Sequence, residues 1–90
     1  MYKRTAIVVN QSGLHARPAS DFVQTASRFA SEITIRRAGK EEEANAKSII
    51  FLLSMGISQG TEVEIEANGP DEQEAADTLA ALIASGFGEA

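Results

Sequence analysis

The hydrophobic residues of this chain recur with two different periods, and the alternation between these periods constrains the fold more than any other feature. Within residues 61–67 the period is two, because Val63, Ile65 and Ala67 alternate with glutamates. A period of two predicts a strand with one buried and one solvated face. Within residues 16–29 the period is three to four, which predicts an amphipathic helix. The apolar positions of that helix are Ala19, Phe22, Val23, Ala26 and Phe29.

The same two patterns assign the rest of the chain. The remaining elements are strands at residues 2–9, 32–37 and 40–45 and helices at residues 48–55 and 71–85. Asp71 and Glu74 stand at the start of the last helix with the spacing of a capping box, in which each side chain satisfies a backbone N–H group. The predicted order is therefore β-α-β-β-α-β-α.

This order predicts an α+β fold of the open-faced β-sandwich type. The glutamate side of residues 61–67 must face water, so we expect a four-stranded antiparallel sheet with three helices on one face. A chain of 90 residues supports one modest hydrophobic core, which predicts a single domain over residues 1–90.

Composition excludes several classes of site. With no cysteine and one histidine, the chain has neither a disulfide nor a thiolate or multi-histidine metal site, so we expect no metal. A net charge of −5, with no tryptophan, one tyrosine and four phenylalanines, is atypical of nucleic-acid binding. No apolar run approaches the ~18 residues that a membrane span requires. The apolar stretch 6–9 is too short for a secretory signal, so we expect a cytoplasmic protein without membrane insertion.

The one histidine stands at the predicted start of the first helix. It belongs to the segment Gly13-Leu14-His15-Ala16-Arg17-Pro18-Ala19. The N–H groups of Ala16 and Arg17 lack partners in the first helical turn, where the helix dipole also adds positive charge. Arg17 adds a fixed cation whose planar fork suits phosphate oxygens. These features favour an anion site beside a nucleophilic imidazole. The alternative is that His15 only caps the helix at the surface, and the spacing by itself leaves both interpretations open.

This segment resembles the active-site signature of HPr, the histidine-containing phosphocarrier of the bacterial phosphotransferase system. Other residues also fall where HPr proteins have similar ones, namely Gln24-Thr25-Ala26-Ser27, Asn45-Ala46-Lys47-Ser48-Ile49, Met55-Gly56 and Gln59-Gly60. The resemblance covers nearly the whole chain, and the predicted order of elements is that of the family. One departure is Ala16, where some members have a threonine, so a hydroxyl contact to phosphate is absent there.

The resemblance implies a phosphoryl carrier rather than a self-sufficient enzyme. His15 would carry the phosphoryl group on its Nδ1 atom, and Arg17 would stabilise that group together with the backbone N–H groups of Ala16 and Arg17. The donor would be enzyme I, itself phosphorylated from phosphoenolpyruvate, and the acceptor would be an enzyme IIA protein or domain. The carrier is expected to be a monomer that needs no cofactor.

Ser48 stands at the start of the predicted helix 48–55, where a serine is a favourable N-cap worth ~1 kcal/mol. In some HPr proteins the matching serine is phosphorylated by HPr kinase/phosphorylase. The resemblance thus makes Ser48 a candidate site of regulatory phosphorylation, with that kinase and transcriptional regulators as candidate partners. A phosphate there would repel an acidic partner that docks over His15.

The predicted helix 48–55 has apolar residues on every side. One sheet cannot cover all of them, so some must remain exposed, and an exposed apolar patch indicates a protein-binding site. HPr proteins dock enzyme I and enzyme IIA partly through this helix. We therefore expect Ile49, Ile50 and Leu53 to form the partner-binding patch, with Arg17 and Lys47 as its basic rim.

Three functions remain open for a chain with these features. It is a carrier of the sugar-transport system, a carrier of the nitrogen-related regulatory branch, or a regulator that only binds its partners with the same fold. His15 argues against the third function, because binding alone does not require a histidine.

Overall fold

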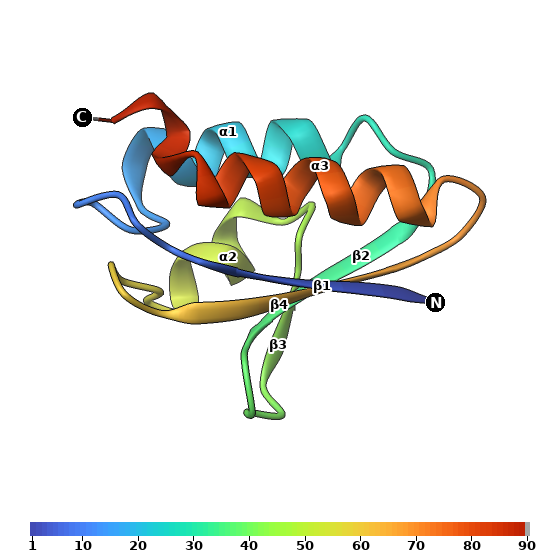
Figure 1. Ribbon diagram of the computed structural model, residues 1–90, viewed down its shortest axis with the longest axis horizontal. Helices are drawn as coiled ribbons and strands as arrows, with labels where there is room; N and C mark the ends of the chain where they lie inside the picture. Colours follow the sequence, from blue (N-terminus) through green and yellow to red (C-terminus); the bar gives the residue numbers. More distant parts are fainter. Residues whose placement is uncertain (90) are drawn as a thin grey trace.

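A computed structural model describes residues 1–89 as a four-stranded sheet with helices packed on one face (Figure 1). The strands are β1 (Tyr2–Ile7), β2 (Glu32–Arg37), β3 (Glu43–Asn45) and β4 (Glu62–Asn68). The helices are α1 (Ala16–Ala26), α2 (Ile49–Ser54) and α3 (Glu72–Ala84), followed by the short 3₁₀-helix η1 (Gly86–Gly88). The predicted α+β architecture and the order of its elements are confirmed.

The sheet is antiparallel throughout and has the strand order β1-β4-β2-β3. The central position of β4 places Ile65 between Arg4 of β1 and Ile35 of β2. The period of two predicted for β4 is confirmed, since Val63, Ile65 and Ala67 are buried while the glutamates between them face away from the helices. One sheet face therefore belongs to the core and the other to solvent.

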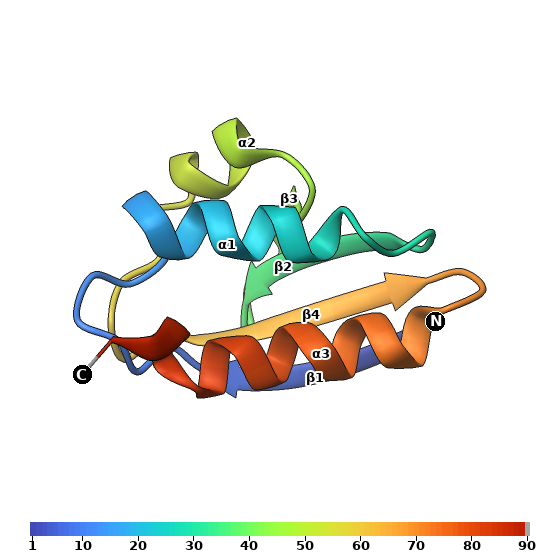
Figure 2. The same cartoon turned by 90° about the horizontal axis from the view of Figure 1, so that it is seen from above.

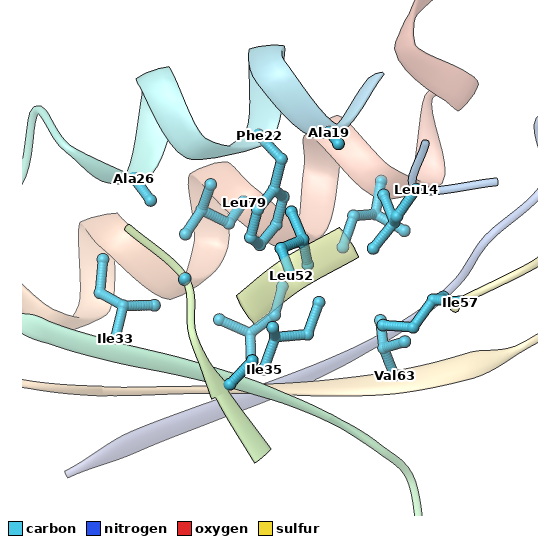
Figure 3. Packing of buried hydrophobic residues seen from close by; sticks show 14 of the residues in the cluster. Leu14, Ala19, Phe22, Ala26, Ile33, Ile35, Leu52, Ile57, Val63 and Leu79 are labelled. Carbon is cyan, nitrogen blue, oxygen red and sulfur yellow. The ribbon is translucent and has the colours of Figure 1, made fainter. Parts of the chain in front are cut away.

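The helices α1 and α3 lie side by side in opposite directions over the sheet, and α2 packs beside α1 (Figure 2). One large side chain from each helix enters the same core. Phe22 of α1, Leu52 of α2 and Leu79 of α3 are all fully buried and point into the space between the helices and the sheet, where Ile35 lies below Leu52 (Figure 3). Burial of each such side chain contributes about 2 kcal/mol. This shared core fixes the helices, and thus their ends, relative to one another.

Three predicted boundaries are wrong by a few residues. The first strand ends at Ile7 instead of residue 9, because Val8 bonds to Thr61 and Gly60 in the loop that precedes β4. The first helix ends at Ala26 instead of residue 29, and its last turn is closed by the Ser27 hydroxyl, which donates to the Val23 carbonyl. The third strand begins at residue 43 instead of 40, because residues 38–42 make the turn of the hairpin.

The capping box predicted for Asp71 and Glu74 is also wrong. The Asp71 carboxylate instead accepts hydrogen bonds from the backbone N–H groups of Ala30 and Ser31, at 2.9 and 3.0 Å, and from the Ser31 hydroxyl. Ser31 is almost fully buried, and its hydroxyl holds the pKa of Asp71 below its usual value, with help from the Ala30 N–H. Asp71 therefore joins the start of α3 to the segment between α1 and β2, and Glu72 accepts from Gly69 in the role predicted for Glu74.

Candidate functional site around His15

His15 is the residue that immediately precedes α1, as the sequence predicts. Its backbone is extended, with φ −130° and ψ 164°, and its side chain makes no hydrogen bond to the helix that follows. The residue is partly exposed. The imidazole is thus not used as a helix cap, which removes the structural role that the sequence left open as an alternative.

Ala16, the first residue of α1, has a left-handed backbone with φ 51°. That conformation costs a residue with a Cβ atom about 1–2 kcal/mol, and it persists only where neighbouring contacts enforce it. Leu14 and Pro18, two residues away on either side, are both buried and anchor the chain around Ala16. This strain was not predictable from the sequence, because alanine is an ordinary residue for the first turn of a helix.

The loop that presents His15 is fastened to the segment after α2. The N–H group of Leu14 donates to the carbonyl oxygen of Ile57 at 3.0 Å. Gly13 has φ 65°, and a Cβ atom at this position would lie 2.6 Å from the same carbonyl oxygen. A glycine is therefore required here both by the backbone conformation and by the close approach of another segment.

The charges at this helix start favour an anion. The first turn of α1 contains no acidic residue, and Arg17 is exposed. Among residues 1–89, Arg17 and Arg28 have no carboxylate within 4.0 Å, whereas Arg4 and Arg36 form ion pairs and Arg37 donates to the Met55 carbonyl oxygen. The dipole of α1 and its unpaired first N–H groups add positive potential beside His15. This arrangement can hold a phosphoryl group next to a nucleophilic nitrogen.

Ser48 directly precedes α2, and its Oγ accepts a hydrogen bond from the N–H group of Phe51 at 3.4 Å. The predicted capping role is thus present. Lys47, predicted for the basic rim, is half-buried, and its ammonium group donates to the carbonyl oxygen of Phe29 at 2.7 Å. That contact holds the ammonium group against the segment that follows α1.

The helix α2 turns an apolar surface outward. Leu52 is buried, whereas Ile50 is 75% exposed, Leu53 41% and Ile49 38%. Phe51, which the sequence analysis did not choose, is 61% exposed and belongs to the same surface. The available signal was helix geometry, because residues adjacent in sequence do not share a helix face, so a helix that buries Leu52 turns Phe51 and Leu53 away from the core. We call Ile49, Ile50, Phe51 and Leu53 the apolar patch.

The described residues 1–89 contain no group of three histidine, cysteine, aspartate or glutamate side chains placed to hold a metal ion. None of the helices in the same range is long and apolar enough to cross a membrane.

Comparisons with known proteins agree with this site. The chain matches the family model described as "PTS HPr component phosphorylation site" over residues 2–85. It is 45% identical over 83 residues to the phosphocarrier protein HPr of Haemophilus influenzae, which covers 92% of this chain and 95% of that protein. It is 51% identical over 73 residues to the HPr-like protein Crh of Bacillus subtilis, which covers 81% of this chain and 84% of that protein.

Solved structures match equally well. HPr-C-His from Thermoanaerobacter tengcongensis superposes with a TM-score of 0.92 at 49% identity, over 100% of this chain and 99% of that one. An HPr dimer from the same organism superposes with a TM-score of 0.76 at 48% identity, over 99% of this chain and 100% of that one.

Proposed function

The chain belongs to the HPr family, the phosphocarriers of the phosphotransferase system, and we propose that His15 is the residue on which it carries the phosphoryl group. The observation that carries this proposal is the placement of His15. Its imidazole stands directly before α1, makes no capping bond, and has Arg17 rather than an acidic residue in the first helical turn.

The proposed reaction is a pair of in-line transfers. The Nδ1 lone pair of His15 attacks the phosphorus of a phosphohistidine on enzyme I, and the bond between that phosphorus and the donor nitrogen breaks. The same displacement then passes the group from His15 to an enzyme IIA protein. Each step exchanges one phosphorus–nitrogen bond for another, so the protein needs to position and shield the group rather than activate it. Arg17 and the N–H groups of Ala16 and Arg17 offset the charge on the phosphoryl oxygens.

A labelling experiment tests this proposal. The protein is incubated with enzyme I and labelled phosphoenolpyruvate, and the stability of the label is measured in acid and in base. A phosphohistidine gives an acid-labile, base-stable label, which His15→Ala must lose while remaining folded by circular dichroism. A label that survives in His15→Ala would refute the assignment.

We also propose that the apolar patch of α2 docks enzyme I and enzyme IIA, with Arg17 and Lys47 at its edge. Its exposed side chains and its position beside α1 support this assignment (Figure 2). Replacing Ile50 by serine should raise the KM for enzyme I by about tenfold, because a buried apolar anchor is lost from a small interface. Ala81→Ser on the exposed side of α3 is the matched control. Equal KM values for the two variants would exclude the patch.

Regulation at Ser48 is a second candidate function, which the position of Ser48 at the N-cap of α2, next to the apolar patch, supports. A phosphate on Ser48 would stand at the start of α2, beside the apolar patch, and would repel an acidic partner. HPr kinase/phosphorylase with ATP should then produce an acid-stable phosphate that Ser48→Ala lacks. Ser54→Ala, at the other end of α2, should keep the phosphate.

We place the carrier in the cytoplasm as a monomer, with the sugar branch of the phosphotransferase system as its first candidate pathway and the nitrogen-related branch as its second. Light scattering across a range of concentrations distinguishes a monomer from the dimeric arrangement that one HPr relative adopts. Competition between a sugar-type and a nitrogen-type enzyme IIA for the labelled carrier distinguishes the two branches, because the preferred acceptor removes the label faster.

A further inference from the structure

Glu89 lies after η1 and reaches back to the loop that precedes His15. Its carboxylate accepts hydrogen bonds from the Ser12 hydroxyl at 2.5 Å, from the Ser12 N–H group at 3.5 Å and from Asn10 Nδ2 at 3.4 Å. These partners are 77 to 79 residues away in the sequence. Figure 2 shows the loop, the start of α1 and the segment after α3 gathered at one end of the molecule.

Asn10 connects Glu89 to the backbone near His15. Only 4% of Asn10 is exposed, and its Nδ2 atom also donates to the carbonyl oxygen of Gly13 at 2.9 Å. Its Oδ1 atom is buried without a hydrogen-bond partner. The side-chain amide of Asn10 is therefore held only by the two hydrogen bonds that its Nδ2 atom donates, one to Gly13 and one to Glu89.

The segment that carries Glu89 is packed rather than loose. Phe87 is partly buried against the core and has a left-handed backbone with φ 57°. A Cβ atom at Gly86 would lie 3.3 Å from the Val9 side chain, so η1 lies close against the chain just after β1. These contacts fix the position of the segment that carries the Glu89 carboxylate.

The carboxylate is not there to neutralise Arg17. The two residues line one hollow, together with Pro18, Asp21, Phe87 and Gly88. Within residues 1–89, however, no carboxylate oxygen comes within 4.0 Å of Arg17, whereas Ser12 and Asn10 occupy both oxygens of Glu89. The Ser12 hydroxyl holds the pKa of Glu89 below its usual value, so the carboxylate is ionised at neutral pH.

We propose that Glu89 is a positioning residue for His15, whose carboxylate fastens residues 10–13 and thereby holds the imidazole in the orientation that phosphoryl transfer requires. This inference rests on the proposed function of His15. Without Glu89 the loop keeps its backbone bonds from Gly13 to Asn10 and from Leu14 to Ile57, but loses the charged acceptor shared by Ser12 and Asn10. A small displacement of the imidazole is enough to slow phosphoryl transfer, because the reaction depends on the alignment of the reacting atoms.

Transfer kinetics with phosphorylated enzyme I test the proposal. Glu89→Ala should lower kcat by about tenfold with little change in KM, the factor expected when a charge-assisted hydrogen bond is lost. Glu89→Gln should recover most of the rate, because its amide oxygen still accepts from Ser12. Glu42→Ala, in the exposed turn between β2 and β3, removes the same charge far from the loop and should behave as the unaltered protein.

A double-mutant cycle and hydrogen exchange complete the test. Ser12→Ala should slow transfer in the unaltered protein but add nothing to Glu89→Ala, since both remove the same contact. The N–H groups of Ser12 and Gly13 should exchange faster with solvent in Glu89→Ala, without any partner protein present. Kinetics equal to those of Glu42→Ala, strictly additive effects, or unchanged exchange would each overturn the proposal. If the unaltered protein is never labelled on His15, the proposed function fails, and the exchange data still decide whether Glu89 fastens the loop.

Discussion

The two ends of the helical layer are built for different purposes. At one end, the start of α3 and the segment between α1 and β2 are joined by the Asp71 carboxylate and the buried Ser31, where every polar atom of the pair is engaged (Figure 1). At the other end, His15 makes no capping bond, Ala16 is strained, and the apolar patch of α2 is exposed. At one end the polar groups are paired within the fold, and at the other, within residues 1–89, the imidazole and the apolar side chains are left without such contacts.

The largest effect that this contrast predicts is on transfer and not on stability. Arg17→Ala should lower phosphoryl transfer from enzyme I by about 100-fold, the loss typical when one charged group that stabilises a transition state is removed. Its unfolding free energy should stay within about 0.5 kcal/mol of the original, as for an exposed side chain without partners. Arg28→Ala, exposed just beyond the other end of α1, is the control. Equal transfer rates in the two variants would contradict the difference that we infer between the two ends of the helical layer.

At the opposite end the effect should fall on stability alone. Ser31→Ala should lower the unfolding free energy by about 2 kcal/mol, because it leaves a carboxylate without its hydroxyl donor. Ser27→Ala loses only a bond within the last turn of α1, so urea unfolding should show a change of about 0.5 kcal/mol or less. Both folded variants should accept the phosphoryl group at the normal rate. A Ser31→Ala protein that is stable but slow in transfer would show that the two ends are coupled.

The strained backbone at Ala16 predicts that the same substitution, alanine to glycine, changes the unfolding free energy in opposite directions at two positions. Ala16→Gly should raise the unfolding free energy by about 0.5–1 kcal/mol, because glycine adopts a positive φ without a steric cost. The same substitution at Ala81, exposed in the regular helix α3, should lower it by about 1 kcal/mol. Thermal unfolding of the two variants measures both values. Destabilisation in both would mean that the backbone at residue 16 carries no strain.

The smallest effect concerns acid stability. Hydrogen bonds from Ser31 and Ala30 lower the pKa of Asp71 in the folded protein. The contribution of Asp71 is therefore fully present above its unfolded pKa of about 3.9, and it is lost as the pH falls through the lower folded value. Asp71→Asn should flatten the decline of the melting temperature in that acid range. A decline that runs parallel in the two proteins would assign acid sensitivity to other carboxylates.

The sequence predicted the features that depend on neighbouring residues. Two hydrophobic periods were enough to place the strands and helices, and the helical period over residues 16–29 was enough to locate the histidine at the start of α1. Features that join distant segments were not predictable in this way. Asp71 has the local spacing of a capping residue, yet its partners lie 40 and 41 residues away. The positive φ of Ala16 and the contact from Glu89 to Ser12 likewise arise only when remote segments pack together.

The central place of β4 has a consequence for how the chain acquires its structure. β1 precedes the other strands in the chain, but within residues 1–89 its one partner strand is β4, which begins at residue 62. On a ribosome, residues 2–7 must therefore wait unpaired until most of the chain has emerged, while β2 and β3 can already form a hairpin. Contacts between such distant segments slow folding, because the intervening loop must close before any pairing is gained. β1 and the loop with His15 that follows it can therefore reach their final structure only after β4 has taken its place in the sheet.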